Sequence, residues 1–168
     1  MLDIKGRVLI LGDHISTDQI ISTKYMLLNS NSEMAKHAFE AISEDFSSKV
    51  NGGDIIVAGF NFGCGSAREQ APEVLKELGI GAIIAKSFNS TFYRNAINIG
   101  LPAFIPESLE YEIDNGDDIH ILISENRVLN KTKNNMMELK PVSDIIKDIL
   151  DCSGLVNYYN KVRNNYEF

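Results

Sequence analysis

One loop of the sequence concentrates residue types that can hold an anion and act on it. The stretch GFNFGCGSAREQAP, residues 59–72, contains Gly63, Gly65, Ser66 and Arg68. Glycine adopts backbone angles that other residues avoid, and it lets a ligand come close to the main chain. A helix is expected directly after this loop, so its free N–H groups and positive dipole end would face the serine and the arginine. The loop therefore predicts an anion site equipped for chemistry.

Two interpretations of Ser66 remain open from the residues alone. Residues 66–69, Ser-Ala-Arg-Glu, have the form of a capping box, in which the serine hydroxyl caps the helix and the glutamate reaches back. Pro72 favours the other interpretation, because a proline six residues past the cap would remove a helical hydrogen bond. If the helix begins nearer Gln70, Pro72 lies in its first turn and Ser66 belongs to the loop ahead of it.

Composition and length limit the class of protein. A chain of 168 residues suggests one domain, spanning 1–168, and a net charge of −7 argues against a nucleic-acid-binding surface. The N-terminus lacks the features of a signal peptide, and no segment approaches the eighteen or so apolar residues of a membrane span. We therefore expect a cytoplasmic protein that has neither nucleic acid nor membrane as a partner.

The residues that bind metals are few and scattered. The two cysteines, Cys64 and Cys152, lie far apart, so the sequence indicates no disulfide framework, zinc site or iron–sulfur cluster on this chain. The three histidines are also dispersed, and His37 falls on the solvent side of its expected helix. We expect no metal site.

The order of elements predicts an α/β fold with a mixed sheet and crossover helices. Strand and helix patterns alternate through the first two thirds of the chain, which is typical of parallel strands. Strands are expected over 5–11, 52–59, 80–88 and 101–106, and helices over 31–42, after the glycine loop as far as Gly79, and over 90–100. The first of these helices would be capped by Asn31 or Ser32. Short alternating runs between 117 and 140 suit antiparallel strands, and two helices broken at Ser153-Gly154 close the chain.

Two separated parts of the sequence resemble one family. GDHISTDQIIS (12–22), followed by YMLLNSN (25–31), and the long stretch from 53 to 102 that contains the glycine loop are similar to the small subunits of 3-isopropylmalate dehydratase. These subunits correspond to the swivelling domain of the aconitase superfamily. The resemblance spans most of the chain and is least distinctive between about 107 and 140.

The resemblance implies a fold, a reaction and a partner. The fold would be the three-layer β/β/α swivelling domain. The reaction would be that of a hydro-lyase, which isomerises 2-isopropylmalate and 3-isopropylmalate through isopropylmaleate in leucine biosynthesis. The chain would act only in complex with a large subunit, whose three cysteines would hold a [4Fe–4S] cluster. This chain would then carry no cofactor.

The family motif also implies roles for the glycine loop. The serine of its Gly-Ser-x-Arg motif abstracts the proton beside a carboxylate, and that role falls on Ser66. Arg68 matches the arginine that binds a substrate carboxylate, for which a guanidinium fork is suited. Gly65 and Ala67 would contact the substrate as well. Aconitases usually have a second serine in place of Ala67, so recognition of the far carboxylate need not follow theirs.

The segment after the Thr-Asp pair sets specificity in this superfamily. Thr17 and Asp18 match that pair and would position the segment. Enzymes of the homoaconitase type have an arginine at the third position of a Tyr-Leu-Arg-Thr stretch, where Leu27 stands here. Tyr25 and Leu27 are therefore expected to contact the substrate, with Leu27 reading an isopropyl group. The alternative is that residues 26–28 simply pack beneath the loop.

Other functions remain open at this level. A small subunit of homoaconitase or of a methylmalate-type dehydratase is the alternative within the superfamily. From a different class, the same helix mouth would serve a non-catalytic anion-binding module. Some iron–sulfur aconitases also bind RNA, but the acidic charge balance weighs against that function here.

Overall fold

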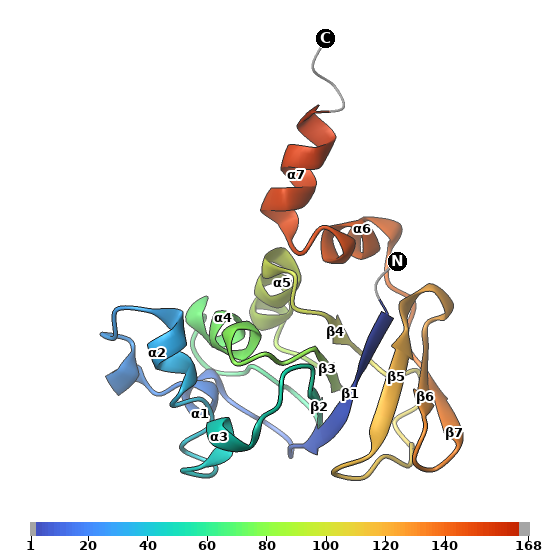
Figure 1. Ribbon diagram of the computed structural model, residues 1–168, viewed down its shortest axis with the longest axis horizontal. Helices are drawn as coiled ribbons and strands as arrows, with labels where there is room; N and C mark the ends of the chain where they lie inside the picture. Colours follow the sequence, from blue (N-terminus) through green and yellow to red (C-terminus); the bar gives the residue numbers. More distant parts are fainter. Residues whose placement is uncertain (1–2, 165–168) are drawn as a thin grey trace.

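The computed structural model describes residues 3–164, which form a seven-stranded mixed sheet flanked by helices (Figure 1). The strand order is β4-β3-β2-β1-β5-β6-β7. The strands are β1 (Asp3–Ile10), β2 (Ile55–Ala58), β3 (Ala82–Ala85), β4 (Ala103–Phe104), β5 (Asp118–Leu122), β6 (Arg127–Asn130) and β7 (Asn135–Glu138). The sequence-based prediction of an α/β fold with a mixed sheet is confirmed.

The first four strands form the parallel half of the sheet. β1 pairs with β2, β2 with β3 and β3 with β4, all in parallel. Helices α4 (Gln70–Glu77) and α5 (Ser90–Ile99) make the crossovers between them. Every residue of β2 and β3 is buried, as expected for parallel strands that are covered on both faces.

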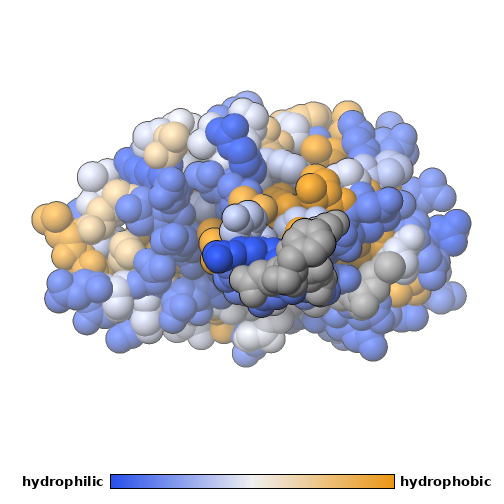
Figure 2. Space-filling model, turned by 90° about the horizontal axis from the view of Figure 1, so that it is seen from above, coloured by the Kyte–Doolittle hydropathy of each residue, from blue (hydrophilic) through white to orange (hydrophobic). Residues whose placement is uncertain are grey.

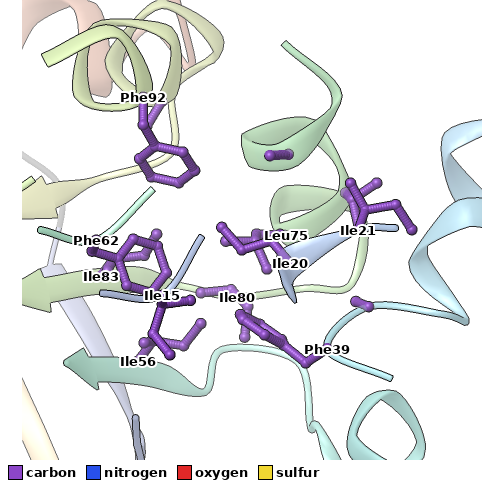
Figure 3. Close-up of a cluster of buried hydrophobic side chains, with 14 of the residues drawn as sticks. Ile15, Ile20, Ile21, Phe39, Ile56, Phe62, Leu75, Ile80, Ile83 and Phe92 are labelled. Carbon is purple, nitrogen blue, oxygen red and sulfur yellow. The ribbon is translucent and has the colours of Figure 1, made fainter. Parts of the chain in front are cut away.

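The side chains of these strands alternate between two hydrophobic cores. In β2, Ile56 enters the core on the helical side, whereas Ile55 and Val57 enter the core on the opposite side. The helical core also contains Leu75 of α4 and Phe92 of α5, and Figure 3 shows these residues around the sheet. The strand period of two thus divides one sheet between two packing layers.

The second core lies between the parallel half and the antiparallel half. β1 pairs with β5, β5 with β6 and β6 with β7, all antiparallel. Ile121 of β5 and Val128 of β6 share a core with Val57 of β2 and Ile84 of β3. The antiparallel strands therefore cover the face of the parallel strands that lies away from α4 and α5 (Figure 1), which gives the expected β/β/α layers.

The remaining helices are short, apart from those at the C-terminal end. They are α1 (Thr17–Ile20), the 3-10 helix η1 (Thr23–Tyr25), α2 (Asn31–Ala35), α3 (Phe46–Lys49), the 3-10 helix η2 (Ile123–Glu125), α6 (Asp144–Asp151) and α7 (Leu155–Asn164). The break between α6 and α7 at Ser153-Gly154 is confirmed: both residues have positive φ, 59° and 128°. α7 extends away from the sheet (Figure 1).

The prediction of a helix over 31–42 was wrong in its length and its cap. α2 ends at Ala35, and its N-cap is Ser30, whose hydroxyl accepts a hydrogen bond from the Glu33 N–H. Phe39 explains the early end. It is completely buried, has a φ of 57°, and donates its N–H to the carbonyl of Ile20. Burial of this ring in the helical core, where it packs on Phe46, overrides the helical periodicity of the segment.

Candidate active site

The two sequence motifs meet at the ends of strands β1 and β2. The Gly63 N–H donates to the Ile15 carbonyl at 2.7 Å, and the Thr17 N–H donates to the Cys64 carbonyl at 2.8 Å. The Thr17 hydroxyl donates to the carbonyl of Ser66 at 3.0 Å. These bonds hold the loop over 11–16 beside the glycine loop, so residues far apart in the sequence form one site.

The glycines of the loop have backbone conformations that require glycine. Gly63 and Gly65 have φ values of 77° and 95°, in the left-handed region. A Cβ at Gly63 would also collide with the ring of Phe92 on α5. Gly63 therefore lets the loop approach α5, and Gly65 turns the chain just before Ser66.

Ser66 is not a helix cap. Helix α4 begins at Gln70, its N-cap is Glu69, and no side chain caps it. The capping-box interpretation is therefore wrong, and the prediction that Pro72 lies in the first turn is confirmed. Ser66 is exposed in the loop that precedes the positive end of α4. Its hydroxyl is thus available to an incoming ligand, as are the exposed neighbours Gly65 and Ala67.

Arg68 links the glycine loop to the Thr-Asp motif and to the segment that follows. Its Nη2 lies 2.6 Å from Oδ1 of Asp18 and donates to the hydroxyl of Thr23 at 3.0 Å. Its Nη1 donates to the carbonyl of Ile21 at 3.1 Å. Only 14% of the Arg68 side chain is exposed, so the guanidinium group is held in one orientation. The Thr23 hydroxyl also donates to Asp18, at 3.3 Å.

Leu27 projects from the segment between α1 and α2. Its exposed fraction is 91%, whereas the flanking Met26 and Leu28 pack against the helical core. The interpretation that all three residues pack beneath the loop is therefore wrong for Leu27 and correct for its neighbours. Figure 2 shows hydrophobic side chains exposed at the end of the molecule that carries α2.

Tyr25 turns toward the segment after α2. Its ring stacks on the ring of His37, with centroids 3.8 Å apart and planes inclined by 10°. The structure thus brings together Ser66, Arg68, Thr17 and Asp18 through direct or shared contacts. It gives Tyr25 a protein partner, and it leaves Leu27 in solvent.

Sequence reasoning missed Thr23 and His37. Thr23 contacts both Arg68 and Asp18, but no motif or spacing marks it. The sequence predicts that His37 faces solvent, because the expected helix over 31–42 continues past the observed end of α2 at Ala35. The turn at Phe39 instead brings its ring onto Tyr25. No motif or spacing in the sequence pairs Tyr25 with His37.

Among the described residues, no group of three or more His, Cys, Asp or Glu side chains is arranged to hold a metal ion. Cys64 and Cys152 are both free thiols. Cys64 is half-buried, and its Sγ lies 3.4 Å from the carbonyl oxygen of His14. No helix within residues 3–164 is both long enough and apolar enough to cross a membrane.

Comparison with known proteins places the site in a family. Residues 13–109, which contain both motifs, match the aconitase C-terminal domain. The chain is 47% identical to the methanogen homoaconitase small subunit of Methanothermobacter thermautotrophicus, over 94% of this chain and 91% of that protein. It is 44% identical to the 3-isopropylmalate dehydratase small subunit of Thermodesulfovibrio yellowstonii, over 95% of each chain.

A solved structure agrees with these sequence comparisons. The crystal structure of 3-isopropylmalate dehydratase from Methanocaldococcus jannaschii superposes with a TM-score of 0.90, at 42% identity over 96% of each chain. The chain therefore belongs to the aconitase C-terminal domain family, and within it is similar to the separate small subunits of 3-isopropylmalate dehydratase and homoaconitase.

Proposed function

We propose that this chain is the small subunit of a hydro-lyase that isomerises 2-isopropylmalate and 3-isopropylmalate through isopropylmaleate. The observation that carries the proposal is the contact between the two motifs. The Thr17 hydroxyl binds the Ser66 carbonyl, and the Asp18 carboxylate binds Arg68. The Ser66 side chain does not cap α4, so its hydroxyl is not used there. The names of the relatives support the same reaction and a separate large subunit as the partner. Such a reaction belongs to leucine biosynthesis.

Ser66 is the proposed general base. A serine alkoxide is costly in water, and preorganised donors and positive charge lower that cost. Here the loop places Ser66 before the N-terminus of α4, and Arg68 follows two positions later in the sequence. The serine would take the proton beside a substrate carboxylate, and an exposed hydroxyl without a helical role is free to do so.

Arg68 is the proposed carboxylate ligand. Asp18 and Thr23 engage Nη2, and Ile21 takes one hydrogen of Nη1. Nε and the second hydrogen of Nη1 are the donors that these contacts do not use. The substrate carboxylate would therefore bind through the remaining donors, while Asp18 and Thr23 keep the guanidinium plane in place. Gly65 and Ala67, which leave the space beside Ser66 open, would line the bound acid.

The large subunit would supply the groups that this chain lacks. When bound, its [4Fe–4S] cluster would polarise the substrate hydroxyl and carboxylate and so acidify the proton that Ser66 removes. The two free cysteines of this chain do not form a ligand set for such a cluster. Docking of the large subunit would also exclude water from the exposed Ser66 loop.

Leu27 is the proposed contact for the isopropyl group. It is 91% exposed, yet it lies in a segment whose other apolar residues are packed. An apolar side chain in this position favours a branched apolar substituent, because a distal carboxylate would be buried there without a partner. We propose Tyr25 as the residue that fixes this segment beside the substrate.

Homoaconitase is the second candidate. The relative from Methanothermobacter thermautotrophicus bears that name and is 47% identical to this chain. Its substrate would present a distal carboxylate in place of an isopropyl group. Position 27 is a leucine and not an arginine, which favours isopropylmalate over homoaconitate as the substrate.

Reconstitution tests the proposal. The purified chain would be mixed with the cluster-loaded large subunit from the same organism, and hydration of isopropylmaleate and of cis-homoaconitate would be followed separately. We expect turnover of isopropylmaleate by the mixture and none by either subunit alone. Turnover of cis-homoaconitate alone would support the second candidate. A mixture that binds both acids without converting them would indicate a non-catalytic anion-binding module.

A further inference from the structure

The segment that presents Leu27 is attached at several points along its length. At its start, the hydroxyl of Thr23 accepts a hydrogen bond from Arg68. Further along, Met26 and Leu28 pack against the helical core. Backbone bonds within the segment run from the Met26 N–H to the Thr23 carbonyl and from the Leu28 N–H to the Tyr25 carbonyl, at 3.1 and 3.0 Å. Leu27 alone among residues 26–28 has no packing partner, so its position depends on how its neighbours are held.

Tyr25 is held by residues that no motif includes. Its ring lies flat against His37, and the Nζ of Lys24 lies 4.5 Å from its centroid. Glu40 joins the same cluster: its Oε2 lies 3.1 Å from Nδ1 of His37, and its Oε1 lies 3.6 Å from Nζ of Lys24. Tyr25 and then His37, by hydrogen bonding, hold the pKa of Glu40 below its usual range. The Glu40 carboxylate therefore stays charged beside His37 and Lys24.

His37 and Glu40 lie on a segment that is itself fixed. Phe39 stands between them and is completely buried, and its ring packs on Phe46 with centroids 4.6 Å apart. A φ of 57° is rare for a bulky residue and persists only where the surroundings enforce it. The Phe39 N–H donates to the carbonyl of Ile20, at the end of α1. The turn at Phe39 thus provides a rigid support for the side chains on either side of it.

We infer that His37 and Glu40 are positioning residues for substrate specificity: they clamp Tyr25 and thereby hold Leu27 in register with Arg68. The inference rests on the proposed function, because it assigns the clamp to the isopropyl end of the same substrate. His37 supplies a flat face for the Tyr25 ring, and Glu40 orients His37 and draws Lys24 over the ring. In this proposal both residues act through Tyr25 and not by contact with the substrate.

The first test measures the clamp without any activity. Hydrogen exchange of the Leu28 amide, which is bonded to the Tyr25 carbonyl, reports whether the segment is held. His37→Ala removes the stacked face, whereas His37→Phe keeps the face and loses Nδ1. We expect faster exchange at Leu28 in His37→Ala and near wild-type exchange in His37→Phe. Unchanged exchange at Leu28 in His37→Ala, with the fold intact by circular dichroism, would overturn the inference.

The second test separates positioning from chemistry in the reconstituted complex. His37→Ala, which loses the stacking contact, should raise KM for 3-isopropylmalate about tenfold, with kcat changed by less than about twofold. His37→Phe, which keeps the stacked face, should have a KM close to that of wild type. Glu40→Gln should raise KM. Glu44→Gln serves as the matched control: Glu44 lines a small cavity together with Lys24, His37 and Glu40, but among the ion pairs of residues 3–164 it is Glu40, and not Glu44, that pairs with Lys24 and His37.

The outcomes distinguish this inference from the proposed function. An active wild-type complex whose His37→Ala variant keeps its KM would overturn the inference alone. An inactive wild-type complex would contradict the proposed function, while amide exchange at Leu28 would still show whether the clamp exists. Equal losses of kcat in His37→Ala and His37→Phe would assign His37 a part in the chemistry and would also overturn the positioning role.

Discussion

The hydroxyl of Thr17 donates a hydrogen bond of 3.0 Å to the carbonyl oxygen of Ser66, across a sequence separation of 49 residues. Thr17 is buried, with 2% of its surface exposed, whereas Ser66 lies in solvent. The buried Thr17 side chain therefore fixes the backbone of the exposed Ser66. We expect this bond to set the direction in which the proposed base points.

Removal of this hydroxyl should lower activity more than stability. Thr17→Val keeps the branched shape, and we expect the free energy of unfolding to fall by about 1 kcal/mol. We expect kcat of the reconstituted complex to fall roughly 10- to 100-fold, because Ser66 is no longer held at the substrate. Thr17→Ser keeps the hydroxyl and should retain most of the rate. Urea unfolding and steady-state kinetics measure the two effects. Equal rates in Thr17→Val and wild type would contradict the role.

Ser66→Ala should abolish most turnover and leave the fold unchanged. Loss of a positioned general base lowers kcat by roughly 10²–10⁴-fold. The side chain caps no helix and is exposed, so the free energy of unfolding should change by less than about 0.5 kcal/mol. Ser90→Ala is the matched control, because Ser90 is also an exposed serine near a helix N-terminus. A Ser66→Ala complex with a near-normal rate would exclude the serine as the base.

Arg68→Lys should weaken substrate binding despite keeping the charge. A lysine ammonium cannot contact Asp18, Thr23 and the Ile21 carbonyl together and still offer donors to a carboxylate. Loss of one charged hydrogen bond, about 1.5–3 kcal/mol, corresponds to a rise in KM of roughly 10- to 100-fold. Kinetics of the reconstituted complex would measure this change. An unaltered KM would place the carboxylate elsewhere.

Much of the fold followed from the sequence because its signals are local. Buried runs such as IIVA and AIIA are too short and too apolar for surface helices, and the glycines at 79 and 100 both have the positive φ that ends a helix. The start of α4 near Gln70 also followed, because proline is tolerated only in the first turn. In each case a single residue type has a strong backbone preference.

The parts that could not be predicted depend on tertiary contacts. The end of α2 is set by burial of Phe39 and by its backbone bond to Ile20 of α1, and helical periodicity contains neither. The partners of Arg68 are a carboxylate, a hydroxyl and a carbonyl far away in the sequence, so no spacing reveals them. Likewise, the exposed fraction of Leu27 depends on how its neighbours pack.

The stability of the antiparallel half should depend on the charge of Asp117. Its Oδ2 accepts hydrogen bonds from the Asp114 N–H at 2.9 Å and from Nδ2 of Asn130 at 2.7 Å. The Asp114 N–H first, then Asn130 and the nearby Lys133, lower the pKa of this carboxyl. A pKa that is lower in the folded state contributes stability above the unfolded value of about 3.9, and this contribution is lost as the pH falls through the folded value.

Asp117→Asn should therefore destabilise the protein at neutral pH more than in acid. We expect the difference in free energy of unfolding between wild type and variant to be largest near pH 7 and to shrink as the pH falls below about 4. Asp118→Asn is the control, because its carboxylate is exposed. Urea unfolding at several pH values measures the difference. A difference that stays constant with pH would show that shape, and not charge, makes Asp117 important.

Leu27→Arg should move substrate preference from isopropylmalate toward homoaconitate. The side chain is 91% exposed, so the free energy of unfolding should change by less than about 0.5 kcal/mol. Desolvation of an isopropyl group is worth roughly 1.5–3 kcal/mol, and we expect kcat/KM for isopropylmalate to fall by about 10- to 100-fold when an arginine replaces that surface. The guanidinium group would pair with the distal carboxylate of homoaconitate. Met136→Arg is the matched control, because Met136 is 62% exposed on β7, in the antiparallel half, and should leave the preference unchanged. A wild-type complex that converts homoaconitate as readily as isopropylmalate would contradict this assignment of Leu27.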